Sequence, residues 1–268
     1  MATNIVVNGA AGRMGRALVQ ACTENSDTEL AAALVRPGSS YAGQDAGVVA
    51  GIAPADVNLI TDPSTLPDKI DAWIDFTLPE GLMSALKYCV DNELPMVIGT
   101  TGLDDQQKET ISQAGNTIPI VFAPNMSVGV NLCLSILQTA AKTLGDDYDI
   151  EIVEAHHKNK VDAPSGTALR MGEVIADAIN IDLDKNAEFT RHGNIGARKP
   201  GTIGFQTIRA GDIVGEHTVT FAGIGERVEI AHIASSRLTF ARGAVRAAIW
   251  IKDQSAGVYD MQDVLGLS

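Results

Sequence analysis

Short apolar runs and amphipathic helical patterns alternate through the first half of the chain. The apolar runs are continuous rather than interrupted by polar residues, which is typical of strands buried on both faces of a sheet. Strands that alternate with helices predict a doubly wound α/β fold, a parallel sheet with helices on both faces. The expected strands are residues 4–7, 30–35, 72–76, 96–98 and 118–122, and the expected helices are residues 13–24, 79–92 and 104–114.

The pattern changes after about Ser127, where a second, α+β domain is expected. Three β-rich segments within residues 202–234 are separated by turns and predict antiparallel strands. Ser235 and Ser236 are expected to cap a last helix that returns to the first domain. Before these segments, a helix is predicted over residues 131–144, a strand over 149–155 and a further helix after Ser165. The predicted domains are residues 1–127 with 237–268, and residues 128–236.

The composition indicates a soluble globular protein, because 45% of the 268 residues are hydrophobic and 20% are charged. The start of the chain lacks the features of a secretory signal, and no stretch approaches the roughly 20 apolar residues that span a bilayer. Cys22, Cys89 and Cys133 are scattered through apolar or small-residue stretches and are expected to be reduced core thiols. A cytoplasmic protein is predicted.

The formal net charge is −13, which disfavours nucleic acid or an anionic membrane as a partner through long-range repulsion. A multiply negative ligand would have to be bound by local groups of cations or backbone N–H donors. The sequence therefore predicts a small-molecule ligand and directs attention to such local sites.

A glycine-rich turn lies between the first expected strand and the first expected helix. Its backbone N–H groups can face a pyrophosphate at the helix N-terminus, and its glycines allow a close approach. The spacing Gly-x-x-Gly-x-x-Gly is a variant of the dinucleotide fingerprint, and the strand-turn-helix context favours a cofactor site over a merely tight turn. The residues of the turn are Gly9, Ala10, Ala11, Gly12, Arg13, Met14 and Gly15.

Arg36 follows Val35 at the end of the second expected strand. Many dinucleotide-binding proteins have an acidic residue here that binds the ribose hydroxyls and repels a 2′-phosphate. Without that carboxylate, a guanidinium favours NADPH. The alternative is that Arg36 is an ordinary solvated charge.

Two further loops lie at the carboxyl ends of expected strands, where open parallel sheets bind ligands. Taken alone, either loop could be only a connection. Their candidate cofactor contacts are Gly99, Thr100 and Thr101 in one loop, and Ala123, Pro124, Asn125 and Met126 in the other.

His156 and His157, with Lys158 and Lys160, form the densest titratable cluster of the sequence. Histidine exchanges protons near neutral pH and lysine supplies a cation, so the cluster suits a reaction that binds an anion and protonates an intermediate. Metal binding is the rival interpretation, but neighbouring residues of an extended segment point to opposite faces, and no metal is predicted. A solvated polar loop is the remaining alternative.

The helix that begins near Ser165 has Gly166 and Thr167 in its first turn. Free N–H donors at such a start bind a carboxylate or a phosphate. An ordinary serine cap would produce the same pattern, and the nearby cluster favours the anion site.

Several of these motifs occur together: residues 9–15, 75–77, 97–102, 125–129 and, above all, 154–167. In combination they resemble the 4-hydroxy-tetrahydrodipicolinate reductase family, formerly called dihydrodipicolinate reductase, over essentially the whole chain. The resemblance implies a Rossmann-type cofactor domain and a substrate-binding domain whose open mixed sheet builds a homotetramer. It also implies a step of the diaminopimelate route to lysine.

The resemblance also implies roles for individual residues. The substrate is a cyclic imine with two carboxylates, which loses water, accepts hydride from NADPH or NADH and is then protonated. His156 is implied as the acid/base residue, Lys160 as the proton donor and His157 as a substrate contact, with the backbone of Gly166 and Thr167 holding a carboxylate. The glycine-rich turn and the two loops are implied as cofactor contacts. Members of the family use both NADH and NADPH, and many have an acidic residue where Val35 stands, so this departure bears on the choice between the two nucleotides.

Two alternatives remain at this point. One is another Rossmann-fold dehydrogenase of amino-acid metabolism that acts on an open-chain substrate. The other is a non-catalytic dinucleotide-sensing protein whose second domain serves only assembly. Residues 154–167 contain no cysteine, which argues against a phosphorylating semialdehyde dehydrogenase.

Overall fold

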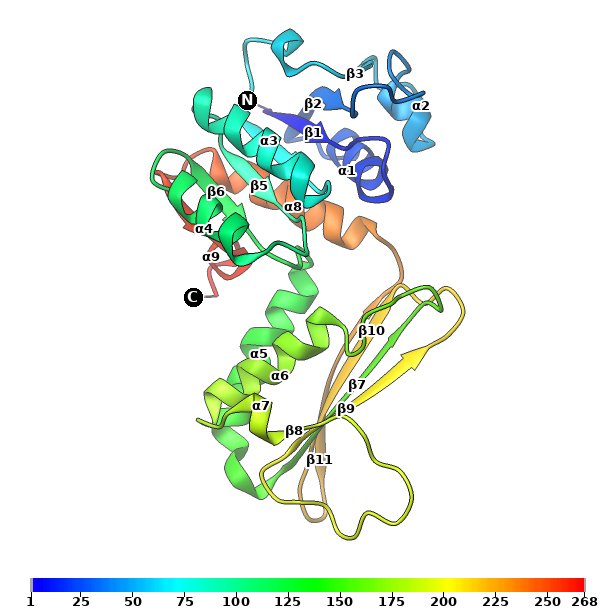
Figure 1. The fold of residues 1–268 in the computed structure, drawn as a ribbon, viewed down its shortest axis with the longest axis vertical. Coiled ribbons are helices and arrows are strands. Elements are labelled where there is room, and N and C mark those ends of the chain that lie inside the picture. The colour runs from blue at the N-terminus through cyan, green and yellow to red at the C-terminus, as the bar shows by residue number, and fades with distance from the viewer. Residues whose placement is uncertain (1, 268) are drawn as a thin grey trace. The chain divides into compact units, whose positions relative to one another are not determined.

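The computed structural model describes residues 2–267, which form two compact units (Figure 1). One unit combines the chain up to Val128 with the segment that starts at Arg237, and the other is the continuous segment Gly129–Ser236. Each unit has its own sheet and its own apolar core. Within residues 2–267, no helix has both the length and the apolar character needed to cross a bilayer.

The first unit is built on a seven-stranded sheet whose strand pairs are all parallel. Its strand order is β12-β6-β5-β4-β1-β2-β3, so the chain changes direction between β1 and β4. Open parallel sheets bind ligands at the carboxyl ends of the strands beside such a switch point. The strands are β1 (Thr3–Asn8), β2 (Thr28–Leu34), β3 (Leu59–Ile60), β4 (Ala72–Asp75), β5 (Met96–Ile98), β6 (Pro119–Phe122) and β12 (Gly257–Tyr259).

Helices cover both faces of this sheet, and alternate residues of β1 divide between the two cores. Ile5 and Val7 belong to the core that includes residues of α1 and α8, whereas Val6 belongs to the core that includes residues of α3 and α4. The predicted doubly wound parallel sheet is therefore confirmed. The helices of this unit are α1 (Arg13–Glu24), α2 (Ala46–Ala50), η1 (Pro63–Thr65), α3 (Pro79–Asp91), α4 (Asp105–Ala114), α8 (Leu238–Ile251) and α9 (Met261–Leu265).

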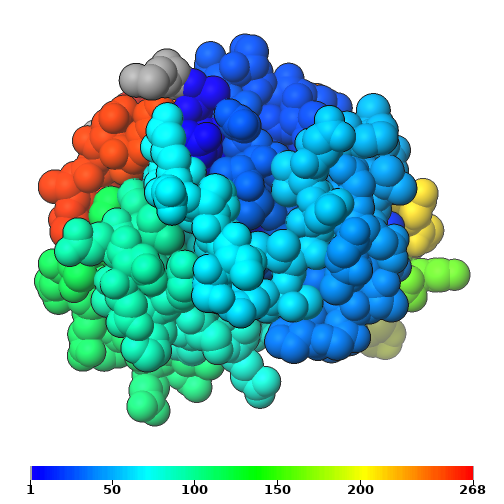
Figure 2. Space-filling view, turned by 90° about the horizontal axis from the view of Figure 1, so that it is seen from above, coloured from blue at the N-terminus to red at the C-terminus, as the bar shows by residue number. Residues whose placement is uncertain are grey.

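The C-terminal segment completes the first unit. β12 pairs with β6, and Lys252 Nζ donates to Thr3 Oγ1 at 2.9 Å. Figure 2 shows this segment in orange-red beside the dark blue start of β1. The residue that precedes the first turn of α8 is Arg237, and its side chain makes no cap hydrogen bond. Because the backbone of Arg237 is already helical (φ −67°, ψ −16°), the helical conformation begins directly after Ser236, and the cap by Ser235 and Ser236 stays a prediction.

The second unit contains a five-stranded mixed sheet in the order β11-β10-β7-β9-β8. Helices α5, α6 and α7 lie on one face of it (Figure 1), and their apolar residues form one core with Ile150, Ile152 and Phe221. The strands are β7 (Asp149–His156), β8 (Ala187–Glu188), β9 (Ile203–Arg209), β10 (Gly215–Ala222) and β11 (Arg227–Ala234). The helices are α5 (Val128–Leu144), η2 (Gly145–Asp147), α6 (Gly166–Ala178) and α7 (Leu183–Asn186).

The three β-rich segments at the end of this unit do not form a simple antiparallel series. β10 and β11 are antiparallel neighbours as predicted, but β9 lies parallel to β7 and is separated by it from β10. The turn between β9 and β10 passes across the end of β7, where Ala210 N donates to His156 O at 2.9 Å. The central strand thus pairs along both edges, an arrangement that turn spacing alone does not reveal.

Candidate active site

The glycine-rich turn of the first unit joins β1 to α1 in a compact form. Gly9 has a left-handed backbone (φ +72°), and its carbonyl accepts from Gly12 N at 2.9 Å. A Cβ at Gly15 would lie 2.1 Å from Gly9 O, closer than any side chain can approach backbone. Only glycine therefore lets the first turn of α1 pack directly against the strand-end turn.

The N-terminus of α1 is open to a ligand. Gly12 is the N-cap residue and supplies no side-chain cap, and the first turn contains no acidic residue. Ala10 N donates to Leu34 O at 2.9 Å, which holds the turn against the end of β2. An uncapped helix start behind glycines is a cradle that fits a pyrophosphate, so the described residues suit a dinucleotide.

A buried carboxylate ties the strand ends around this cradle together. Asp75 ends β4 and is 0% exposed. Its Oδ2 accepts from Asn8 Nδ2 at 2.7 Å, and its Oδ1 accepts from Thr77 N, Thr77 Oγ1 and Thr100 Oγ1 at 2.8 to 2.9 Å. Asn8 Oδ1 in turn accepts from Gly9 N at 3.1 Å. One side chain thereby fixes the loops that follow β1, β4 and β5.

Exchanging the side chains of Asp75 and Asn8 tests whether their hydrogen bond supports the cofactor cradle. Asp75→Asn leaves an amide N–H₂ facing either Asn8 Nδ2 or Thr77 N, both of which are donors, and we expect it to raise the Kd for NADPH by about tenfold or more. Asn8→Asp in the same chain restores an amide opposite a carboxylate and should recover most of the affinity, as measured by fluorescence titration. A double variant no better than Asp75→Asn would contradict this role of Asp75.

The remaining predicted cofactor residues differ in exposure. Arg36 is exposed and lies two residues beyond the end of β2, whereas the intervening Val35 is 6% exposed and belongs to the apolar core. Arg13, Thr101 and Pro124 are also exposed. Five others are buried and can contribute only shape and backbone: Ala10, Gly99, Thr100, Ala123 and Met126.

In the second unit, the helix-covered face of the sheet turns from apolar to polar along its strands. On β7, Ile150 and Ile152 belong to the core, and Glu154 and His156 follow on the same face. The register places Thr207 and Arg209 of β9 and His217 of β10 beside them. The polar side chains of three strands therefore gather at one end of the sheet.

Glu154 lies at the centre of this cluster and is 1% exposed. Arg209 donates to both of its carboxylate oxygens at 2.8 Å, and His156 Nδ1 lies 2.6 Å from Oε2. Burial alone would raise the pKa of Glu154, but these hydrogen bonds outweigh burial and lower it. The side chain is therefore an anion at neutral pH.

His156 and His217 are both buried, with ring centroids 5.1 Å apart in an edge-on arrangement. Burial lowers the pKa of His156, an effect that Glu154 partly offsets and that Lys160 and Arg209 reinforce. Burial, with His156 nearby, lowers the pKa of His217 to about 4. His217 is thus neutral at physiological pH, and its Nε2 lies 3.0 Å from Ser165 Oγ.

The predicted proton donor and the predicted anion site lie in the segment that follows β7. Lys160 Nζ pairs with Asp162 Oδ2 at 2.8 Å, and Asp162 O accepts from Arg209 Nη2 at 2.6 Å. Ser165 is the N-cap of α6 and accepts from Ala168 N at 3.1 Å. Gly166 is exposed, and a Cβ there would meet nothing within 4 Å. The start of α6 is therefore accessible and lies in the same cluster as His156.

Models of a single enzyme family match both halves of the chain. The N-terminal model of dihydrodipicolinate reductase matches residues 3–126, and the C-terminal model matches residues 129–265. The chain belongs to the dihydrodipicolinate reductase family.

Individual members of this family resemble the chain along its length. Enzymes named 4-hydroxy-tetrahydrodipicolinate reductase from Hahella chejuensis and Pseudomonas fluorescens (strain Pf0-1) are each 56% identical, over 99% and 98% of both chains respectively. A solved structure, dipicolinate-bound dihydrodipicolinate reductase from Paenisporosarcina sp. TG-14, has a TM-score of 0.75 at 24% identity. That structure covers 98% of this chain and is itself covered to 99%. This structural comparison supports the two-unit fold of the chain.

Sequence reasoning did not single out Asp75, Glu154, Arg209 or His217 as functional residues. Asp75, Glu154 and His217 are buried polar residues on strands where the pattern expects apolar ones, and Arg209 is a half-buried one. That mismatch was the available signal, because a buried polar side chain requires partners. His157 was predicted, and its Nδ1 is buried without a hydrogen-bond partner among the described residues.

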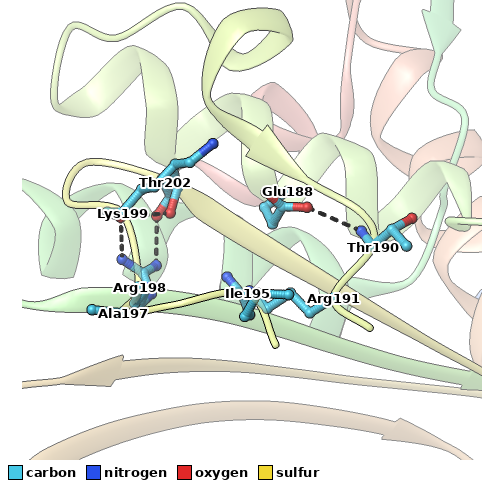
Figure 3. A pocket seen from close by; sticks show the side chains of 8 residues that line it. All are labelled: Glu188, Thr190, Arg191, Ile195, Ala197, Arg198, Lys199 and Thr202. Atoms are coloured by element: carbon cyan, nitrogen blue, oxygen red, sulfur yellow. Dashed lines mark hydrogen bonds between the residues drawn. The ribbon is translucent and has the colours of Figure 1, made fainter. Parts of the chain in front are cut away.

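A separate pocket of about 210 Å³ lies between β8 and the loop that leads to β9 (Figure 3). Arg191 and Arg198 line it, and both pair with Glu151, at 2.7 and 3.0 Å. None of the predicted catalytic or binding residues lines this pocket. The polar cluster at the end of the sheet therefore remains the candidate site.

Proposed function

We propose that this chain reduces 4-hydroxy-tetrahydrodipicolinate with NAD(P)H to give tetrahydrodipicolinate, in the diaminopimelate route of lysine biosynthesis. The observation that carries the proposal is the cluster of His156, Lys160 and the open start of α6 in a chain 56% identical to enzymes of that name. NAD(P)H, held on the glycine-rich turn of the first unit, supplies a hydride. We further propose the reductase as a cytoplasmic enzyme.

The residues of the second unit suit the other steps of this reaction. Loss of the 4-hydroxyl group as water gives a conjugated cyclic imine, hydride adds at C4, and the resulting enamine takes up a proton. We assign acid/base exchange to His156 and proton donation to Lys160. The N–H groups of Gly166 and Thr167 hold one substrate carboxylate, and His157 contacts the substrate.

Turnover separates this proposal from its rivals. NADPH oxidation is measured in a coupled mixture of pyruvate, aspartate semialdehyde and the condensing synthase. Oxidation that requires all components supports the proposal. No oxidation, with intact NADPH binding, would favour a sensing protein, and oxidation with an uncyclised semialdehyde or amino acid would favour another dehydrogenase.

NADPH is the proposed preferred nucleotide, because the exposed Arg36 follows β2 where a carboxylate would repel a 2′-phosphate. A charged guanidinium–phosphate contact contributes about 1.5 to 3 kcal/mol. We expect Arg36→Ala to raise KM for NADPH about tenfold or more while leaving KM for NADH nearly unchanged. Equal changes for the two nucleotides, measured by initial rates, would remove Arg36 from the phosphate site.

A bulky residue at position 166 tests the carboxylate site. The backbone of Gly166 is not left-handed and a Cβ there is unobstructed, so Gly166→Val should fold. Its branched side chain would occupy space in front of the α6 N–H groups. We expect affinity for pyridine-2,6-dicarboxylate, measured by calorimetry with NADPH present, to fall about tenfold or more, with a smaller loss in Gly166→Ala. Unchanged affinity would place the carboxylate elsewhere.

A homotetramer is the proposed assembly. In the described residues no helix covers the second face of the five-stranded sheet, where Ile208 and Ile233 are 46% and 69% exposed. Burying this face against other copies would remove apolar surface from water. Sedimentation velocity should give one species of four chains.

A further inference from the structure

Glu154 connects more parts of the cluster than any residue with a proposed role in it. Its carboxylate accepts from Arg209 on β9 through two bonds of 2.8 Å and from Thr207 Oγ1 at 3.2 Å. It also accepts from Ser165 N at 3.1 Å, beside the start of α6, and lies 2.6 Å from His156 Nδ1. The acid/base residue and the anion-binding helix start therefore share one buried partner.

The charge of Glu154 determines which ring nitrogen of His156 carries a proton. An ionised carboxylate can only accept hydrogen bonds, so Nδ1 must be the protonated nitrogen facing it. Arg209 keeps the carboxylate ionised in spite of its burial. Nε2 then remains as the nitrogen that gains and loses a proton.

The space beside Nε2 is kept open by a glycine. A Cβ at Gly215 would lie 3.2 Å from His156 Nε2, closer than a side-chain carbon normally approaches. Gly215 begins β10, two residues before His217, whose ring meets that of His156 edge-on. Because position 215 is glycine, β10 places no side-chain carbon from this residue against Nε2.

We propose that Glu154 is a positioning residue that keeps His156 protonated on Nδ1, reserves Nε2 for proton exchange, and holds the anion-binding start of α6 beside it through Ser165 N. This inference rests on the proposed function, in which His156 exchanges a proton with the substrate. It links proton exchange at His156 to carboxylate binding at the start of α6, since both depend on Glu154.

The charged groups around His156 make the expected pH effect specific. Lys160 and Arg209 lower its pKa, as does burial, and only Glu154 raises it. His217 of β10 faces the ring and is neutral at physiological pH, while Asp162 pairs with Lys160. Removing the Glu154 charge therefore leaves only influences that disfavour protonated His156, and its titration should move to lower pH.

Glu154→Gln removes the charge and keeps the shape. We expect kcat at neutral pH to fall about 10- to 100-fold and the His156 limb of the pH–kcat profile to move down by about 1 to 2 pH units. The matched control is Glu151→Gln, which removes an arginine-paired carboxylate from the same strand without contact to His156. That control should keep the wild-type profile. A Glu154→Gln enzyme with the wild-type profile would overturn the inference.

NMR spectroscopy of the protein with Glu154 intact tests the inference even if Glu154→Gln does not fold. In ¹⁵N-labelled protein, with His156 assigned by comparison with His156→Gln, the neutral ring should show a protonated Nδ1 and an unprotonated Nε2. A ring protonated on Nε2 would overturn the inference. The same spectra report the pKa of His156 directly.

These results separate the inference from the proposed function. If the wild-type protein does not turn over the substrate, the proposed function fails while the state of the His156 ring is still measured. If His156→Ala loses kcat and Glu154→Gln keeps both kcat and profile, only the role of Glu154 fails.

Discussion

Replacing His156 or Lys160 by alanine is expected to lower kcat by about 10² to 10⁴, the usual contribution of a general acid or base. Both residues lie in the polar end of the second unit, where His156 contacts Glu154 and Lys160 pairs with Asp162. Neither belongs to the apolar core, so melting temperature should change little for Lys160→Ala, whereas His156→Ala also removes a hydrogen bond to the buried Glu154 and should melt somewhat earlier. Stopped-flow and steady-state rates with saturating NADPH would give kcat for each variant.

Lys158→Ala is the matched control for these variants. Lys158 lies in the same segment, but its side chain is exposed and outside the contacts of the cluster. It should keep a kcat near that of the wild type and the same affinity for NADPH. If either His156→Ala or Lys160→Ala also kept a near-normal kcat, the assigned role of that residue would have to be withdrawn.

Gly15→Ala is expected to reduce NADPH affinity by about 100-fold or more, which corresponds to about 2.8 kcal/mol. The added Cβ would lie 2.1 Å from Gly9 O and 2.6 Å from Ala10 Cα. Because both are backbone atoms, the helix must move away from the turn, and the cradle for the pyrophosphate opens. Overpacking of this kind also costs about 1 to 3 kcal/mol of stability. Fluorescence titration and thermal melting would measure the two effects.

Gly51→Ala is the matched control, because it should lower stability without changing the glycine-rich turn that holds the pyrophosphate. Gly51 ends α2 with a left-handed backbone (φ +84°), so alanine is strained there although nothing lies within 4 Å of its Cβ. This variant should melt earlier and still bind NADPH like the wild type. Gly15→Ala with unchanged Kd would mean that the turn of residues 9–15 does not hold the nucleotide.

The elements with strong local periodicity could be predicted closely from the sequence. α1 spans Arg13–Glu24 as expected, and Asp104 and Gln107 form the predicted reciprocal cap of α4. Short elements were missed, including α2 and β12, because a few residues carry no measurable period. β12 exists through its pairing with β6, a contact between distant parts of the chain.

The candidate site could be predicted only where its residues lie close together in the sequence. His156, Lys160 and the start of α6 are close in sequence, and local spacing was enough to group them. Arg209 and His217 reach the cluster only through the register of β9 and β10 with β7. The sequence predicts no strand order for this sheet, so the contact of Arg209 with Glu154 and that of His217 with Ser165 are not visible in it.

The division of the first unit between the two ends of the chain affects the order in which the protein can fold during synthesis. Its core on one face of the sheet includes Val245 and Ile251 of α8, and its edge strand β12 pairs with β6. Gly129–Ser236 is continuous and can therefore close first, although its synthesis begins later. Until the ribosome releases the last residues, the core that α1 shares with α8 lacks the α8 side chains, so one face of the sheet is only partly covered. A nascent chain of this design should accordingly bind chaperones longer than its modest size suggests, and early termination near Arg237 should leave a folded second unit attached to an unfinished first one.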